Sequence, residues 1–279
     1  MPLDKRLNAY RPDLADARLA DRVPVSRYAE GRPHVVSAPL IDVKAEPRHD
    51  ARQTTQALMG EPVAVFEIAD GWAWCQLGRD GYVGYVEAGA LVEGIEEATH
   101  EVAVPNTFLY PASDLKSAPY STVYMNTPLS VGDVGEKWSR LADGRYVFTR
   151  HVRPLGTASG EPAAAAVVFE HTPYLWGGRT RLGLDCSGLV QTAVHACGLA
   201  CPRDTDMMER EFGTALPMDP AGLERGDLVF WSGHVGMMLD GERLIHANGH
   251  HMLTVIEPLS EALRRIGSMF GQPTSFRRP

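Results

Sequence analysis

The chain has 279 residues, 44% hydrophobic and 22% charged, with a formal net charge of −8. This length allows two or three domains with substantial cores, and the negative charge gives no overall attraction to nucleic acid or anionic membranes. No stretch approaches the about 20 consecutive apolar residues of a membrane span. The polar N-terminal segment lacks the apolar core of a signal peptide. We therefore expect a cytoplasmic protein that binds neither nucleic acid nor membrane.

The first half of the chain has the pattern of β-structure. Residues 1–30 form a polar arm in which residues 13–20 favour a short helix. Residues 31–94 contain short apolar or alternating segments bounded by Gly, Asp or Pro, as is typical of strands. Residues 95–157 repeat this character. The sequence thus predicts two consecutive all-β domains.

A weak internal repeat supports this division. WCQLGRDGYVGYVEAGAL (residues 74–91) aligns with WSRLADGRYVFTRHVRPL (residues 138–155), each with a Trp, an Asp-Gly turn and an aromatic strand. Asp-Gly between two apolar strands is a strong hairpin signal. Two such hairpins predict two small β-barrels in tandem. The alternative is two hairpins of one sandwich.

Residues 158–279 differ in character and alternate between helical and strand patterns, which predicts an α+β domain. A Gly-, Pro- and Ala-rich stretch precedes it, and residues 163–171 suit a helix that opens the domain. Further expected elements are helices at 186–197 and 260–266 and strands at 227–233, 234–239 and 243–248.

The four cysteines, Cys75, Cys186, Cys197 and Cys201, do not form a zinc-ribbon pattern, because the last pair has C-x3-C spacing and no second pair accompanies it. Four cysteines in this length are also far from a disulfide-rich composition. We expect neither a structural disulfide nor a metal site, and expect Cys75 and Cys197 to be buried as small apolar residues.

Cys186 is placed at the start of a predicted helix. The apolar residues that follow it recur at helical spacing, Gly198 ends the pattern, and Asp185 or Ser187 could cap the N-terminus. In the first turn, the unpaired N–H groups and the helix dipole would lower the thiol pKa and could stabilise an oxyanion. The same pattern is typical of many buried cysteines, so the helix start alone leaves both interpretations open.

A nucleophilic cysteine needs a base, and His234 and His246 are the candidates. They lie on two predicted strands that flank Asp240-Gly241. A two-residue loop would put the two histidines on opposite faces of the sheet. A three-residue loop at 239–241 would pair them directly, with Gly241 in the left-handed position. We expect the odd-length loop, because a thiol, an imidazole and a group that orients it are what nucleophilic acyl transfer requires.

At this point the sequence resembles a known family. The segments YLWGGRTRLGLDCSGLVQ, CPRDTDMME, LERGDLVFWSGHVGMML and LIHANG, in this order, are similar to the motifs of the NlpC family of papain-like cell-wall peptidases. The resemblance covers about residues 165–277. The segments DGYVGYV and WSRLADGRYV resemble less specifically the bacterial SH3-like modules of the three-domain members. The implied fold is a papain-like α+β domain, in which a helix packs on an antiparallel sheet, at 158–279. Two SH3-like domains, at 31–94 and 95–157, would precede it.

The resemblance also implies roles for individual residues. Cys186 would be the nucleophile, His234 the base and His246 the group that orients His234. Asp185 and Ser187 match positions that hold the amine and peptide of the substrate, whereas Trp176 and Arg203 match positions that line the cleft. In three-domain relatives a tyrosine of the first SH3-like module limits the depth of the cleft. Tyr82 or Tyr85 could take this part, and we favour Tyr82.

The implied activity is hydrolysis of γ-D-glutamyl–diamino acid bonds in small murein peptides with a free N-terminal L-Ala, as in peptide recycling. No metal or cofactor is expected, and the partner is the murein peptide. An amidase or acyltransferase on the same fold is an alternative, although the chain lacks an amphipathic membrane-binding segment. A non-catalytic wall-binding protein is another, which the intact Cys186, His234 and His246 disfavour. The preferred diamino acid and the oligomeric state stay open.

Overall fold

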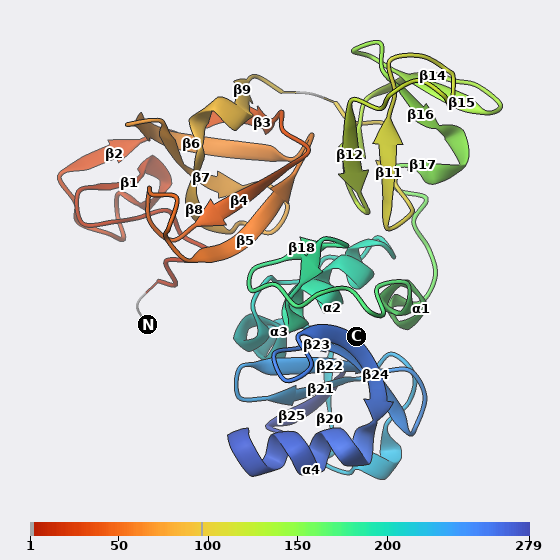
Figure 1. The fold of residues 1–279 in the computed structure, drawn as a ribbon. Helices are drawn as coiled ribbons and strands as arrows, with labels where there is room; N and C mark the ends of the chain where they lie inside the picture. Colours follow the sequence, from red (N-terminus) through yellow and green to blue (C-terminus); the bar gives the residue numbers. More distant parts are fainter. Residues whose placement is uncertain (1–2, 96) are drawn as a thin grey trace. The chain divides into compact units, whose positions relative to one another are not determined.

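The computed structural model describes residues 3–95 and 97–279. The chain divides into two compact units, Met1–Leu155 and Gly156–Pro279, whose elements are labelled in Figure 1. None of the helices among the described residues is long and apolar enough to cross a membrane. The finer division of the first unit at residues 30 and 94 stays a prediction.

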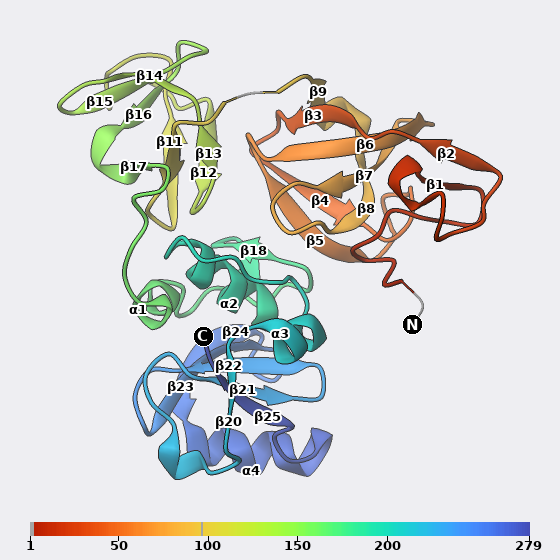
Figure 2. The ribbon, with the colours of Figure 1, turned by 180° about the vertical axis from the view of Figure 1, so that it is seen from behind.

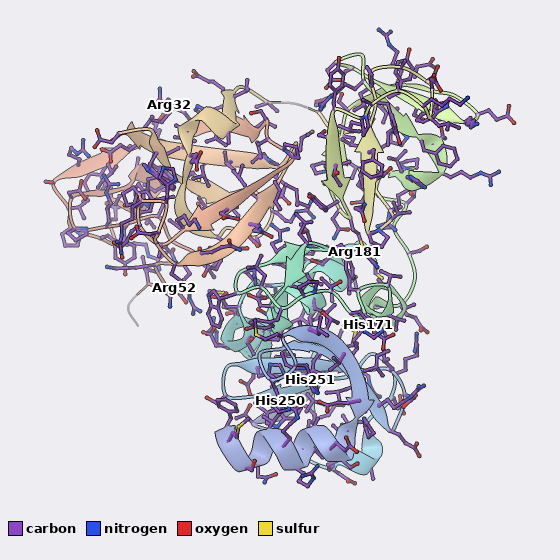
Figure 3. The ribbon with its side chains drawn as sticks, in the orientation of Figure 1. Arg32, Arg52, His171, Arg181, His250 and His251 are labelled. Carbon is purple, nitrogen blue, oxygen red and sulfur yellow. The ribbon has the colours of Figure 1, made fainter. Side chains whose placement is uncertain are left out.

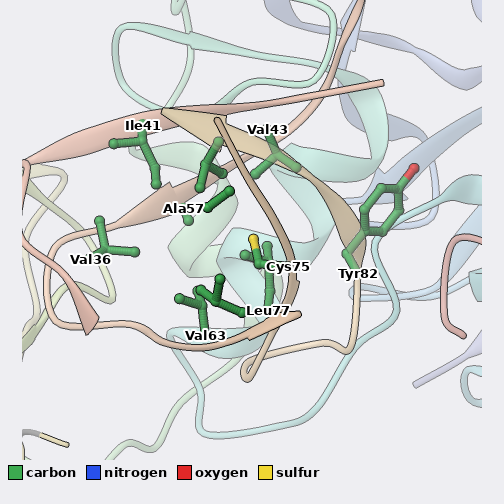
Figure 4. Close-up of a cluster of buried hydrophobic side chains, with 11 residues drawn as sticks. Val36, Ile41, Val43, Ala57, Val63, Cys75, Leu77 and Tyr82 are labelled. Carbon is green, nitrogen blue, oxygen red and sulfur yellow. The ribbon is translucent and has the colours of Figure 1, made fainter. Parts of the chain in front are cut away.

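The first β-module of this unit, residues 32–93, is a seven-stranded antiparallel sheet in the order β5-β4-β8-β7-β6-β3-β9 (Figure 1). Its inward residues, among them Val43, Val65 and Cys75, form an apolar core in which these three are fully buried (Figure 4). The core follows from the alternation seen in the sequence, since successive strand residues face opposite sides. The strands are β3 (Arg32–Val36), β4 (Leu40–Lys44), β5 (Gln53–Leu58), β6 (Pro62–Ala69), β7 (Trp72–Leu77), β8 (Val83–Glu87) and β9 (Leu91–Glu93).

The helix predicted at residues 13–20 is wrong. The arm instead forms β1 (Leu14–Asp16), a single 3-10 turn (Ala17–Leu19) and β2 (Arg27–Ala29), which pairs with β1 in parallel. The Asp16 carboxylate accepts a hydrogen bond from Arg18 N–H and thereby caps this short turn. Leu14 packs with Phe66 and Trp74 of the first β-module. This tertiary contact outweighs the weak local preference for a helix.

The second β-module has smaller sheets, in the orders β13-β10-β17, β11-β12 and β14-β15-β16. Val102, Leu109, Val123 and Val147 are fully buried in its core. The strands are β10 (His100–Val102), β11 (Asn106–Leu109), β12 (Ser121–Tyr124), β13 (Pro128–Leu129), β14 (Val131–Val134), β15 (Trp138–Leu141), β16 (Tyr146–Phe148) and β17 (Val152–Pro154).

The internal repeat has a structural counterpart. Both copies run strand, Asp-Gly turn, strand, 3-10 turn, strand: β7, β8, Ala88–Ala90 and β9 in the first, β15, β16, Thr149–His151 and β17 in the second. In both turns the Asp carboxylate, Asp80 or Asp143, accepts the N–H two residues later. In both, the following glycine has a positive φ, which favours glycine. This supports two modules of one kind, and the SH3-like assignment of the second stays a prediction.

The second unit is built on a six-stranded sheet in the order β20-β25-β21-β22-β23-β24. Figures 1 and 2 show α2 and α4 on opposite sides of this sheet. The helices are α1 (Pro162–Val167), α2 (Cys186–His195), α3 (Thr205–Glu211) and α4 (Leu259–Phe270), with a 3-10 turn at Pro220–Gly222. The strands are β18 (Arg179–Thr180), β19 (Gly183–Leu184), β20 (Thr214–Leu216), β21 (Leu228–Trp231), β22 (His234–Met238), β23 (Arg243–Asn248), β24 (Leu253–Pro258) and β25 (Ser275–Arg278).

The predicted helices and strands of this unit are found, whereas α3, β18, β19, β20, β24 and β25 were not expected. Cys197, expected to be buried, is half-buried, and all four cysteines are free thiols.

The sheet presents two different faces. Met238 of β22 and Leu244 of β23 pack with Leu259, Ala262 and Ile266 of α4. Since alternate residues share a face, His234 and His246 project to this same side. Val235 and Ile245, both fully buried, face the side on which α2 lies. The two histidines therefore occupy the α4 side of the sheet.

Candidate active site

Cys186 is the first residue of α2. Asp185 is the N-cap, and its carboxylate accepts a hydrogen bond from Gly188 N–H at 2.6 Å, which satisfies one of the unpaired donors of the helix start. A Cβ at position 188 would lie 2.1 Å from the Gly178 carbonyl oxygen. Glycine is therefore needed there, and the DCSG segment fixes the backbone beneath the thiol.

The Cys186 thiol lies against the backbone on either side of His234. Its Sγ is 4.0 Å from the Gly233 carbonyl oxygen, Val235 N–H is a hydrogen-bond partner from the other side, and Thr205 Oγ1 lies at 3.8 Å. The N-terminus of α2 and the start of β22 thus meet at the thiol. Thr205, the first residue of α3, carried no signal in the sequence that linked it to this site.

Burial raises the pKa of the Cys186 thiol to about 11, and the Asp185 carboxylate adds to the rise. The N–H groups of Val235 and Ser187 and the Thr205 hydroxyl oppose this rise without overcoming it. The helix start does contribute the expected lowering, through Ser187 N–H, but the net pKa of the thiol is raised. The thiol is only 6% exposed, and the cost of desolvating a thiolate outweighs the helix dipole.

Asp185, Ser187 and Arg203 form a buried polar cluster behind the thiol. The Arg203 guanidinium, 1% exposed, donates to both Asp185 carboxylate oxygens at 3.0 and 2.9 Å and to Ser187 Oγ at 2.8 Å. Gly177 N–H donates to the same carboxylate at 2.8 Å. Arg203 therefore acts on the site through these two side chains, since its guanidinium has no open surface.

The β22–β23 hairpin has an odd-length loop, as expected, but in a different register. Met237 pairs with Ile245 and Met238 with Leu244, and Leu239 N–H bonds the Arg243 carbonyl oxygen, so the loop spans residues 240–242. His234 and His246 therefore share a face as diagonal neighbours, not as a direct pair. Gly241 is absent from the positive-φ glycines of the described chain, so its predicted left-handed conformation is wrong. The Asp240 carboxylate instead closes the turn by accepting the N–H groups of residues 242 and 243.

The two histidines are directly hydrogen-bonded. His234 Nε2 lies 2.8 Å from His246 Nδ1, and the Trp231 ring lies against His234 with 5.7 Å between centroids. Burial, followed by the proximity of His246, lowers the pKa of His234 well below its ordinary value. His234 is therefore a neutral base at pH 7, held by a hydrogen bond on one side and an aromatic ring on the other.

The polar chain continues beyond His246, which is fully buried. His246 Nε2 lies 2.7 Å from Glu257 Oε1 of β24 and 3.1 Å from Asn248 Nδ2. Arg265 of α4 forms an ion pair with the same Glu257 oxygen. Sequence reasoning missed Glu257 and Arg265. The available signal was a carboxylate in the apolar run LTVIEP, beside a histidine-bearing strand.

A cavity of about 390 Å³ opens beside His234. Its polar lining includes Tyr174, Asn248 and Arg265, and Met269 and Phe270 of α4 add apolar surface. Burial, together with the charges of Cys186 and Asp185, raises the pKa of Tyr174. Its hydroxyl therefore stays protonated at neutral pH and is available as a donor, a feature that the sequence did not reveal.

The remaining histidines show no metal-binding arrangement. His195, which the position on the Cys186 helix let us expect at the surface, is buried, as is every residue of α2. His250 and His251 lie side by side in the turn after β23 (Figure 3), with ring centroids 4.7 Å apart. Within residues 3–95 and 97–279, no cluster of three or more His, Cys, Asp or Glu side chains is placed to hold a metal ion.

The other predicted substrate-contacting residues are found in different settings. Trp176 is 57% exposed and is not part of the cavity lining. Tyr82 is buried at the edge of the first β-module core, and its hydroxyl points away from the core (Figure 4). Tyr85 accepts a hydrogen bond from Arg11 at 3.3 Å and so is engaged by the N-terminal arm. The roles assigned to Trp176 and Tyr82 stay predictions.

The arrangement suits nucleophilic acyl transfer. The Cys186 thiol lies at a helix N-terminus against the backbone that flanks His234, and the His234 ring is bonded to a second imidazole. A thiol, an imidazole and a group that orients it are the parts that cysteine hydrolases use. Because the thiol has a raised pKa and the imidazole a lowered one, both are neutral at rest.

Comparisons with known proteins give matches to two families. Residues 44–91 match the family described as bacterial dipeptidyl-peptidase Sh3 domain, and residues 171–264 match the NlpC/P60 family. The chain is 28% identical, over 74% of its length and 70% of the relative, to gamma-D-glutamyl-L-lysine dipeptidyl-peptidase of Bacillus cereus. It is 24% identical, over 77% of its length and 87% of the relative, to dipeptidyl-peptidase 6 of Lysinibacillus sphaericus.

The fold has a solved counterpart as well. The crystal structure of an NlpC/P60 family protein from Bacillus cereus superposes with a TM-score of 0.74 at 20% identity, covering 88% of this chain and 99% of the other. The chain therefore carries a papain-like cysteine-peptidase domain of the NlpC/P60 family together with a bacterial dipeptidyl-peptidase SH3 domain.

Proposed function

We propose that this protein hydrolyses the bond between γ-linked D-glutamate and a diamino acid in murein-derived peptides with a free N-terminal L-Ala. Cys186 is the nucleophile, His234 the base and His246 the group that orients it. The observation that carries the proposal is the meeting of the Cys186 thiol with the backbone flanking His234, whose imidazole is bonded to His246 at 2.8 Å. The names of the relatives given above support the choice of bond.

The reaction proceeds in two halves. Cys186 Sγ attacks the γ-carbonyl carbon of D-glutamate, and the thiol proton passes to His234 Nδ1, the ring nitrogen that His246 leaves free. N–H groups at the start of α2 stabilise the oxyanion. The C–N bond then breaks, His234 gives its proton to the leaving amine, and a thioester remains. Water attacks this thioester, loses a proton to His234, and the C–S bond breaks to release the dipeptide and restore the thiol.

The free N-terminus of the substrate is the proposed basis of specificity. Asp185 and Ser187 lie directly beside the nucleophile, and a charge-assisted hydrogen bond between the substrate ammonium and Asp185 contributes about 1.5–3 kcal/mol. Tyr82 limits the depth of the cleft in this proposal. Such a site favours small released peptides, as in murein recycling, over intact wall strands whose stem peptides have no free amine.

Hydrolysis of L-Ala-γ-D-Glu-L-Lys and of its meso-diaminopimelate counterpart, followed by mass spectrometry, tests the proposal. Release of L-Ala-D-Glu is expected, with a kcat/KM at least about tenfold lower for the N-acetylated peptide, which is about 1.4 kcal/mol. Tyr82→Ala should recover part of that loss.

Cys186→Ser is the matched control, because it keeps the size of the side chain and should abolish turnover with little change in Tm. Wall binding without turnover in the wild type would instead support a non-catalytic protein. Equal rates on free and acetylated peptides would contradict the ammonium contact.

A further inference from the structure

The polar chain that starts at His234 follows a regular path across three neighbouring strands. His246 on β23 pairs with Val255 of β24, and Glu257 lies two residues further along β24 on the same face. Each step from His234 to His246 to Glu257 is therefore a diagonal between adjacent strands, a spacing that long side chains can bridge. Arg265 reaches Glu257 from α4, which packs on this face.

The hydrogen bonds of this chain determine which ring nitrogens carry protons. An ionised carboxylate only accepts hydrogen bonds. Although burial opposes ionisation, the bonds from His246 and Arg265 hold the pKa of Glu257 below its ordinary value, so Glu257 is charged. His246 Nε2, at 2.7 Å, must then donate to Glu257. Since burial keeps His246 neutral, its Nδ1 has a lone pair and accepts from His234 Nε2–H. His234 Nδ1 is left with the lone pair that a base needs.

Asn248 favours the opposite arrangement. Its Oδ1 accepts from His251 N–H at 2.9 Å, which fixes the amide so that Nδ2–H points at His246 Nε2 at 3.1 Å. The Asn248 Nδ2–H donor favours an unprotonated Nε2 on His246. His246 would then be protonated at Nδ1 and donate to His234 Nε2, which would leave the proton of His234 on Nδ1. In the intact protein the shorter, charge-assisted bond to Glu257 is the stronger of the two.

We propose that Glu257 is a positioning residue that selects the tautomer of His246, and through it provides the free lone pair on His234 Nδ1, while Arg265 holds the Glu257 carboxylate in place. This proposal rests on the thiol-peptidase function proposed above. Glu257 would thus be the fourth member of the series Cys186, His234, His246 and Glu257, and it would act without touching substrate.

Removal of Glu257 has a specific expected result. In Glu257→Ala the Asn248 amide becomes the stronger partner of His246 Nε2, and the tautomers of both histidines reverse. The base then faces the thiol with a proton. We expect kcat to fall by about ten- to a hundredfold, as is typical when a partner that orients a functional histidine is lost, with KM changed much less. Glu257→Ala/Asn248→Ala removes the competing donor and should recover part of the lost kcat.

The test combines ¹⁵N NMR of the imidazoles with steady-state kinetics. In the wild type without substrate, His246 should be protonated at Nε2 and His234 at Nε2, and in Glu257→Ala both should be protonated at Nδ1. Glu257→Gln keeps an oxygen acceptor and should retain the wild-type tautomers and more activity than Glu257→Ala. Glu261→Ala, which removes an exposed carboxylate from the first turn of α4, is the control for the loss of a nearby charge.

Unchanged tautomers in folded Glu257→Ala would overturn the proposal, as would a loss of kcat equal to that of Glu261→Ala. If Glu257→Ala does not fold, the tautomers can be measured in Glu257→Gln/Asn248→Ala instead. Protonation of both histidines at Nε2 in that variant supports the proposal, and protonation at Nδ1 refutes it. The NMR result does not depend on turnover. If the wild type cleaves no murein peptide, the proposed function is refuted. The NMR measurement would still test whether Glu257 selects the tautomer of His246.

Discussion

Two buried polar clusters start on α2 and β22, the two elements that meet at the Cys186 thiol, and they differ in what their hydrogen bonds can do. In the Asp185–Arg203–Ser187 cluster, both carboxylate oxygens receive permanently protonated donors: a guanidinium and backbone N–H groups. In the histidine chain, each link is a ring nitrogen that can donate or accept. The donors of the first cluster cannot pass on a proton, whereas the ring nitrogens of the second can hold, release and redirect one.

This difference assigns distinct tasks to the two sides of the nucleophile. A guanidinium is not deprotonated in proteins, so the ion pair between Asp185 and Arg203 fixes the start of α2. Imidazoles with lowered pKa values stay neutral and can accept the thiol proton. Substitutions in the first cluster should therefore affect stability most, and substitutions in the second should affect turnover most.

The largest expected effect comes from the base. His234→Ala removes the acceptor of the thiol proton, and kcat should fall by about 10²- to 10⁴-fold, while Tm changes little because His234 lies at the edge of a cavity. Steady-state kinetics and thermal unfolding measure the two quantities. A Tm loss as large as that of an Arg203 variant would contradict the division between a cluster that serves stability and one that serves turnover.

Arg203→Leu should show the opposite profile. It leaves the Asp185 charge buried without its guanidinium partner, which typically costs about 3–5 kcal/mol of unfolding free energy. Urea unfolding measures this loss. The double variant Asp185→Asn/Arg203→Leu should recover part of it, because the uncompensated charge is gone. Full stability in Arg203→Leu would contradict a structural task for this cluster.

Ser187→Ala should destabilise the first cluster less than Arg203→Leu does. It removes one hydrogen bond to the Arg203 guanidinium, and bonds to charged groups contribute about 1.5–3 kcal/mol. The midpoint of urea unfolding should shift accordingly, and the tautomers of His234 and His246 should stay those of the wild type. An altered tautomer in Ser187→Ala would show that the two clusters are coupled.

The smallest expected effect is the change of kcat with pH, which should be nearly flat around neutrality. Protonation of His234 stops proton transfer, and because burial lowers its pKa, this loss moves below the range of an ordinary histidine. The raised thiol pKa likewise moves any alkaline change upward. Between about pH 5.5 and 8.5, where unperturbed His and Cys titrate, kcat should vary by less than about threefold. An acid limb centred near pH 6.5 would contradict a buried neutral base.

The sequence predicted those parts of the site that depend on local pattern. Helical spacing after Cys186 and the strands around Asp240-Gly241 placed the thiol at a helix start and both histidines on one face. The loop position was wrong by one residue, because the Asp240 side chain closes the turn. An even shift of the pairing preserves the face on which a side chain lies, so the functional prediction was unaffected.

Other features depend on tertiary packing and could not be predicted locally. The thiol pKa follows from burial among α2, α3 and β22, and Glu257 joins the relay only because β24 pairs with β23. Residues 13–20 form a short strand and a 3-10 turn because Leu14 packs with Phe66 and Trp74. In each case the deciding partner lies far along the chain.

The central claim is that Cys186 forms the bond to the γ-carbonyl of D-glutamate. The most direct measurement uses a chloromethyl ketone built on L-Ala-γ-D-Glu, in which the reactive carbon replaces the leaving amine, followed by peptide mapping of the labelled protein. We expect a single label, on Cys186, and no modification of Cys75, Cys197 or Cys201. Substrate and the His234→Ala substitution should each slow the labelling of Cys186. Labelling at another residue, or labelling of Cys186 at a rate that substrate does not slow, would contradict it.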